Sequence, residues 1–158
     1  MKSLFRAGLR RPTDSVVGVD LSPEMADEAR RRSPEADFRV GDAYALPVDG
    51  GVRGVPGGQG FHELAEPELA LAEARRVLVP GGRIVLSGHE WEALVIDSVH
   101  PALTREIVRA RASAITAPRA ARGFRRLLAG SGVREVSVEG VVGFLDREAY
   151  WLEGAVFG

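Results

Sequence analysis

The chain has 158 residues, enough for one domain around one hydrophobic core. Its formal net charge is -1, so charge gives no reason to expect nucleic acid as a partner, and the absence of cysteine excludes disulfides and thiolate chemistry. The apolar runs are too short to span a bilayer, and the N-terminal residues lack the apolar region of a signal peptide. We therefore expect a cytoplasmic protein without a membrane partner.

Strand-like and helix-like segments alternate near the N-terminus. Residues 15–20 form a β-branched run that ends in a carboxylate, and residues 37–40 resemble a second strand. Between them the sequence predicts a helix from Ser22 to about Arg32, because Ser22 is a good N-cap and Pro23 suits the first helical position. Such alternation is typical of an α/β fold with a mostly parallel sheet.

The pattern breaks down between Leu46 and Gly60, where two prolines and six glycines favour neither a strand nor a helix. Residues 51–60 (GVRGVPGGQG) are therefore predicted not to form a central strand. Order returns beyond this segment, with helices over 66–78, 101–115 and 118–129, a strand over 83–87, and one or two strands over 133–145. The pattern of the tail from residue 146 is ambiguous between helix, strand and loop.

Four segments in a fixed order resemble the class I S-adenosylmethionine-dependent methyltransferases that act on small molecules. They are residues 16–25 (VVGVDLSPEM), 38–47 (FRVGDAYALP), 73–86 (EARRVLVPGGRIVL) and 124–133 (FRRLLAGSGV). The resemblance implies a Rossmann-like sheet with helices on both faces, in a single partial domain over 1–158 whose family-like core covers about 15–142. It also implies S-adenosylmethionine as the cofactor and a small molecule as the methyl acceptor.

The same resemblance assigns cofactor contacts to five residues. A carboxylate at the end of a strand lies at the ligand-binding edge of an open α/β sheet. By the family pattern Asp20 holds the cofactor ribose, Leu21 and Met25 line the adenine pocket, and Asp42 and the Ala43 backbone N–H contact the adenine ring. The alternatives are helix capping for Asp20, core packing for Leu21 and Met25, and a turn role for Asp42. Ser22 is the better cap, which favours ribose binding by Asp20.

The first strand and glycine loop of the family have no counterpart in this sequence, and residues 1–14 would match the helix that follows that loop. In the family strand order the missing strand lies in the middle of the sheet. Its loss would leave backbone N–H and C=O groups unpaired on both sides. We therefore expect a chain that is marginally stable, aggregated, or completed by another chain, for example as a homo-oligomer.

Residues 51–60 stand where the family has its fourth strand. Lys2 is the only lysine, and this arginine-rich usage is typical of a high-GC gene. A reading frame shifted forward by one base permits a family-like strand in place of these residues. We therefore hypothesise that this segment is read out of frame, with a true glycine-rich surface loop as the alternative.

The three histidines are His62, His89 and His100. His89 follows the strand over 83–87, where it could contact a substrate or act as a base, although a solvated loop histidine is the simpler interpretation. His62 and Glu63 lack the spacing of a helical zinc motif, so no metal site is expected.

Three functions stay open from the sequence. The first is methyl transfer, and the second is a decayed, inactive methyltransferase fragment with at most an interaction role. The third is a nicotinamide-dependent Rossmann oxidoreductase, which also places an acidic residue after its second strand. Gly41-Asp42-Ala43 and Pro80-Gly81-Gly82 are more typical of methyltransferases than of that third class.

Overall fold

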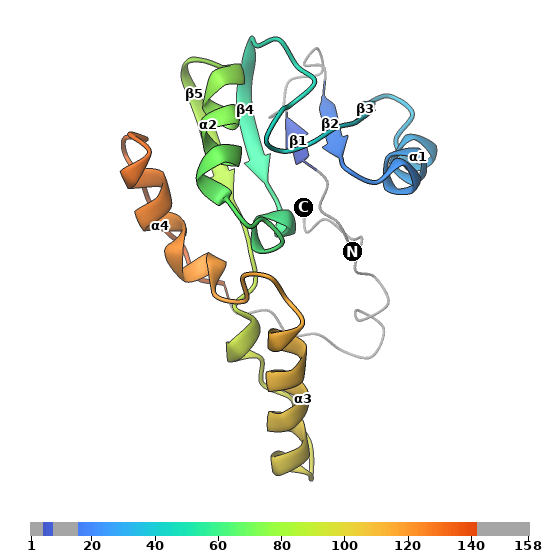
Figure 1. Cartoon of the computed structure of the whole chain (residues 1–158), viewed down its shortest axis with the longest axis vertical. Coiled ribbons are helices and arrows are strands. Elements are labelled where there is room, and N and C mark those ends of the chain that lie inside the picture. Colours follow the sequence, from blue (N-terminus) through green and yellow to red (C-terminus); the bar gives the residue numbers. More distant parts are fainter. Residues whose placement is uncertain (1–4, 8–15, 142–158) are drawn as a thin grey trace.

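The computed structural model of the chain describes residues 5–7 and 16–141 (Figure 1). The described strands belong to two small sheets. In chain order these strands are β1 (Phe5–Ala7), β2 (Val17–Asp20), β3 (Asp37–Val40), β4 (Val52–Gly57) and β5 (Leu78–Leu86).

The two sheets lie side by side and meet at β1. In the first sheet β2 pairs parallel with β3 and antiparallel with β1, so that Val17 lies opposite Asp37 and Asp20 opposite Val40. In the second sheet β4 pairs parallel with β5. β1 also contacts β4, but no hydrogen-bonded ladder between these two strands is found in the described residues. The strands therefore follow one another in space as β3, β2, β1, β4 and β5.

The helices complete an α/β arrangement. α1 packs against β2 and β3, α2 contacts β5, and α3 extends away from the sheets (Figure 1). The helix bounds are α1 (Pro23–Arg32), α2 (Pro67–Val77), α3 (Pro101–Ser113) and α4 (Ala120–Gly130), with 3₁₀ turns η1 (Gln59–His62) and η2 (Trp91–Ala93). The predicted α/β class with mostly parallel pairing is confirmed.

The start of α1 follows the predicted local chemistry. The Ser22 side chain caps the helix by accepting a 3.3 Å hydrogen bond from the Met25 backbone N–H. Pro23 takes the first turn, where its missing N–H has no intrahelical partner to lose. Ser22 is thus the cap, as the sequence predicted.

The main core lies where α2, β4 and η1 meet. α2 contributes the largest share of any element, because its apolar residues recur with helical spacing and face the sheet. The principal cluster of buried side chains comprises Val19, Leu46, Val55, Phe61, Ala70, Ala74, Val77 and Phe124. The rings of Phe61 and Phe124 meet edge to face with centroids 6.0 Å apart, which joins η1 to α4.

The expectation that residues 46–60 form neither a strand nor a helix is wrong for residues 52–57. Val52–Gly57 forms β4, and its residues Gly54, Val55 and Gly57 are buried. β4 has a hydrogen-bonded neighbour on one side, at β5, and a strand with a single ladder tolerates Pro56. Gly57 leaves room for the Phe61 ring, which a Cβ at that position would overlap. The strand needs no change of reading frame, and the frame hypothesis itself remains for DNA sequencing to test.

Two further predictions need correction. β5 begins at Leu78 and runs through Pro80-Gly81-Gly82, where the register is irregular, so the strand is longer than the predicted 83–87. The predicted strands over 133–145 do not form within 133–141, and residues 142–145 lie outside the described part. No strand partner reaches that segment, and Val138 and Val141 are exposed.

The N-terminal prediction also differs from the structure. Residues 1–14 were expected to match a helix, but Phe5–Ala7 forms β1, and the other residues of that range lie outside the described part. β1 occupies the central place between β2 and β4, and it runs antiparallel to β2.

Candidate functional site

Asp20 lies at the carboxyl end of β2 and is the anchor of the predicted cofactor site. Its side chain is buried, with 2% of the residue exposed, and Oδ1 accepts a 2.8 Å hydrogen bond from the Ser22 backbone N–H. The Gly41 backbone N–H donates to the Asp20 carbonyl at 2.9 Å, which joins the end of β2 to the segment after β3. The carboxylate is therefore held in one orientation at the edge where parallel α/β sheets bind ligands.

Leu21 and Met25 follow this carboxylate within five residues of the chain. Leu21 is 57% exposed directly after β2, and Met25 is half-buried in the first turn of α1. An exposed leucine beside a buried carboxylate gives an apolar surface next to a hydrogen-bonding group. Leu21 and Met25 thus lie close to Asp20 in the chain, and their contact with adenine remains a prediction.

Asp42 and Ala43 follow β3 at the same edge. Asp42 is exposed, and its Oδ1 accepts a 2.9 Å hydrogen bond from the Tyr44 backbone N–H, so it has the turn role weighed as an alternative. Ala43 is half-buried and packs against the main core. Gly41 and the parallel pairing of β2 with β3 bring this turn beside Asp20. An adenine contact from Asp42 or Ala43 stays a prediction.

Side chains of α2 hold the loop that continues from this turn. Glu73 accepts a 2.8 Å hydrogen bond from the Leu46 backbone N–H, and Arg76 donates to the Val48 carbonyl at 2.8 Å. Arg76 also pairs with Glu73 at 2.7 Å, and this bond is the main reason that the pKa of Glu73 lies below its usual value. The loop is thereby tied to the half of the molecule that contains β4 and β5.

A row of aromatic rings lies beyond the carboxyl ends of β4 and β5. Trp91 meets His62 on one side, with ring centroids 5.5 Å apart, and His89 on the other, at 5.4 Å. The Arg111 guanidinium lies over the Trp91 ring, 5.1 Å from its centroid. His62 and Trp91 are buried, and His89 is exposed. We call His62, His89, Trp91 and Arg111 the ring cluster.

Sequence reasoning considered His89 but found no role for His62. The two histidines are separated by 26 intervening residues and no local spacing connects them; only the pairing of β4 with β5 brings their loops together. Burial lowers the pKa of His62 as the main cause, with Glu63 acting in the opposite direction. His62 is therefore neutral at neutral pH.

Backbone bonds and ion pairs fasten the ring cluster. The Ala117 backbone N–H donates to the His62 carbonyl at 2.8 Å. Glu90 accepts from Arg122 at 2.6 Å, and Glu92 accepts from Arg119 at 2.8 Å. These contacts connect the segment after β5 to Arg119, directly before α4, and to Arg122 within α4. The two residues next to Trp91 in the chain are therefore both fixed by ion pairs.

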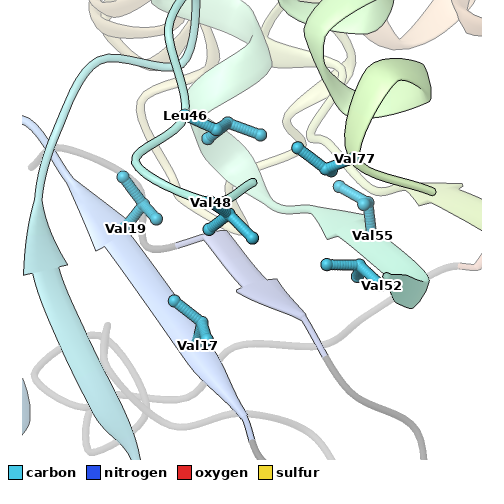
Figure 2. Close-up of a pocket in the computed structure, with 7 residues that line it drawn as sticks. All are labelled: Val17, Val19, Leu46, Val48, Val52, Val55 and Val77. Carbon is cyan, nitrogen blue, oxygen red and sulfur yellow. The ribbon is translucent and has the colours of Figure 1, made fainter. Parts of the chain in front are cut away.

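A small apolar cavity of about 20 Å³ lies between the two sheets (Figure 2). Its lining comes from β2, β4, α2 and the loop after β3, and consists of Val17, Val19, Leu46, Val48, Val52, Val55 and Val77. The cavity has no polar lining group, and at this size it is a packing gap, too small for a cofactor.

Within 5–7 and 16–141, no group of three His, Asp or Glu side chains comes together as metal ligands. In the same residues, no helix has the length and apolar character needed to cross a membrane.

A family model for the methyltransferase domain matches residues 2–86, which is more than half of the chain. The chain belongs to this methyltransferase family. The match covers β1 to β5 and includes every predicted cofactor residue, and it confirms the resemblance to S-adenosylmethionine-dependent methyltransferases.

Curated relatives agree with this assignment. The chain is 40% identical over 104 residues to an uncharacterised 37.1 kDa protein in transposon Tn4556 of Streptomyces fradiae, covering 61% of this chain and 30% of that protein. It is 44% identical over 82 residues to the demethylmenaquinone methyltransferase of Thermus thermophilus, covering 49% of this chain and 37% of that enzyme. The matches thus span about a third of the length of these relatives.

Solved structures support the fold. A SAM-dependent methyltransferase from Thermotoga maritima superposes with a TM-score of 0.56 and 21% identity, over 73% of this chain and 53% of that one. At this identity the likeness concerns the fold alone, and it supports the Rossmann-like α/β architecture.

Proposed function

We propose that this chain carries the S-adenosylmethionine site of a methyltransferase that acts on a small-molecule acceptor. The observation that carries the proposal is Asp20, a buried carboxylate held at the carboxyl end of β2 beside the Gly41-Asp42 turn. Membership of the methyltransferase family supports the reaction type. The relative from Thermus thermophilus, named as a demethylmenaquinone methyltransferase, supports a small molecule as the acceptor.

The residues at this edge fit an adenosine group. A carboxylate accepts hydrogen bonds from a ribose diol, and Asp20 is kept in place for this by Ser22 and by the strand itself. Leu21 and Met25 supply apolar surface beside it, and Asp42 supplies a second acceptor on the neighbouring strand end. When bound, S-adenosylmethionine supplies an electrophilic methyl group on a sulfonium. The residues of the chain would then act mainly by positioning the two reactants, which can lower a barrier by about 7–11 kcal/mol.

Substitution of Asp20 tests the cofactor site. Asp20→Asn keeps the size of the side chain and removes its charge, so the affinity for S-adenosylhomocysteine should fall by about 30-fold or more in titration calorimetry. Asp97→Asn, which alters an exposed aspartate between η2 and α3, is the matched control and should bind as the parent chain does.

Titration calorimetry with S-adenosylhomocysteine and with NAD distinguishes the functions that the sequence left open. Binding of S-adenosylhomocysteine without binding of NAD supports the methyltransferase site. Binding of neither ligand supports a decayed fragment, and unchanged affinity in Asp20→Asn would remove Asp20 from the site.

A further inference from the structure

Two polar ring atoms in the ring cluster are buried and have no hydrogen-bond partner among the described residues. They are His62 Nδ1 and Trp91 Nε1, on side chains whose residues are 5% and 8% exposed. Buried polar atoms in proteins are nearly always paired, so two unpaired atoms on rings in mutual contact call for an explanation. Both rings follow strands that end at the same sheet edge as β2, where the arrowheads of β2 and β4 point (Figure 1).

The two atoms have complementary hydrogen-bonding character. The indole Nε1–H of Trp91 is a donor only. His62 Nε2 lies 3.5 Å from Glu63 Oε1, and this carboxylate favours the tautomer with the ring proton on Nε2 and a lone pair on Nδ1. A partner for both atoms must therefore accept one hydrogen bond and donate another. A hydroxyl does both, whereas an ammonium cannot accept and a carboxylate cannot donate.

The charge of Arg111 favours the same class of ligand. Arg111 lies over Trp91, whereas the charges of Arg119 and Arg122 are offset by ion pairs with Glu92 and Glu90. A cationic amine would be repelled by Arg111, while an oxygen that gains negative charge would be stabilised by it. The exposed His89 ring, in contact with Trp91, marks where the cluster meets solvent.

We propose that the ring cluster is the acceptor end of the site and that His62 takes the proton from a weakly acidic hydroxyl, such as that of a phenol or an enol. This inference rests on the proposed function. The acceptor O–H bond breaks and its proton moves to His62 Nδ1. The oxygen electron pair forms the bond to the methyl carbon, and the electron pair of the breaking carbon–sulfur bond passes to sulfur, which leaves a neutral thioether. The lowered pKa of His62 keeps the ring neutral and able to accept the proton.

A spectroscopic test uses the whole chain with ¹⁵N-labelled histidine. The three histidines give separate ring signals, and His62 is assigned by elimination from His89→Gln and His100→Gln, which leave the buried ring in place. Phenol added in the presence of S-adenosylhomocysteine should shift the His62 Nδ1 signal, and benzylamine should not. If phenol leaves the Nδ1 signal unshifted, this atom contacts at most water, and the inference is wrong.

Kinetics supply the second readout. His62→Gln should lower the rate of phenol methylation by about 10²- to 10⁴-fold, remove the acidic limb of the pH–rate profile and leave the affinity for S-adenosylhomocysteine unchanged. His100→Gln, an exposed histidine at the start of α3, is the control and should keep the full rate. A full rate with an unchanged pH profile in His62→Gln would overturn the role of His62. If the parent chain itself does not bind S-adenosylhomocysteine, the result would instead count against the proposed function.

Discussion

The two halves of the sheet are held together in different ways. β2 and β3 have four residues each, and their surroundings bury Val19, Ala26 and Phe38. The half with β4, β5, α2 and α4 contains most of the main core and is fastened by contacts between distant segments. The first half holds the predicted cofactor carboxylate, and the second holds the ring cluster. Packing that stabilises the fold is thus concentrated in the half with the ring cluster, while the half with Asp20 relies on a few close contacts.

The largest effect is expected from the core of the second half. Leu71→Ala removes a side chain of α2 that is fully buried, so the free energy of unfolding should fall by about 2–5 kcal/mol in urea denaturation. Leu69→Ala lies on the same helix at a position that is 51% exposed and should change stability by less than about 1 kcal/mol. Equal losses in the two variants would mean that α2 does not face the sheet as described.

A smaller effect is expected where β2 meets β3. A Cβ on Gly18 would overlap the ring of Phe38, which lies on the paired strand, so Gly18→Ala should cost about 1–3 kcal/mol. Phe38→Leu in the same chain should recover part of that loss, measured as a double-mutant cycle by thermal unfolding. Gly130→Ala, whose Cβ would meet nothing within 4 Å, is the control and should be neutral or stabilising. Absence of coupling between positions 18 and 38 would contradict the close packing of these strands.

The smallest effect is a dependence of the free energy of unfolding on pH. It originates in His62, in the half with β4 and β5. Burial lowers the pKa of His62 from the model-peptide value of 6.5, with Glu63 opposing the shift and His89 and Arg111 adding to it. The unfolded chain therefore binds the proton more readily than the folded one. The stability that neutral His62 contributes is complete above pH 6.5 and is lost as the pH falls toward the lowered value in the folded state, by at most about 1.4 kcal/mol per pH unit.

Urea denaturation of the parent chain and of His62→Gln across this pH range measures the effect. The difference in unfolding free energy between the two should change below pH 6.5 and stay constant above it. A constant difference over the whole range would show that His62 does not titrate in this way. His100→Gln, which alters an exposed histidine, should follow the parent chain at every pH.

Local chemistry made part of the fold predictable. α1 begins at Pro23 and ends at Arg32, as its cap and the following proline indicated. The strand over 37–40 and the helix that ends near Val77 were also found where the sequence predicted them. In these segments propensity, capping and periodicity agree, so little depends on distant residues.

Other segments could not be predicted because their structure depends on neighbours. β4 forms from a run of glycines and a proline because β5 pairs with it and Phe61 fills the space beside Gly57. The valines of 133–141 alternate as a strand would, yet they find no partner strand and stay irregular. Sheet pairing is a tertiary property, so a β pattern without a partner edge is not enough to make a strand.

The candidate site divides in the same way. The sequence alone predicted a cofactor carboxylate, because Asp20 and Asp42 stand in ordered motifs, each at or just after a strand end. Only the tertiary structure decided the ring cluster, since His62, Trp91 and Arg111 come from three separate segments that share no spacing. Motif residues are close along the chain, and their geometry follows from a single turn. Residues that meet through packing are placed by the pairing of β4 with β5 and by the loops that those strands carry to one edge.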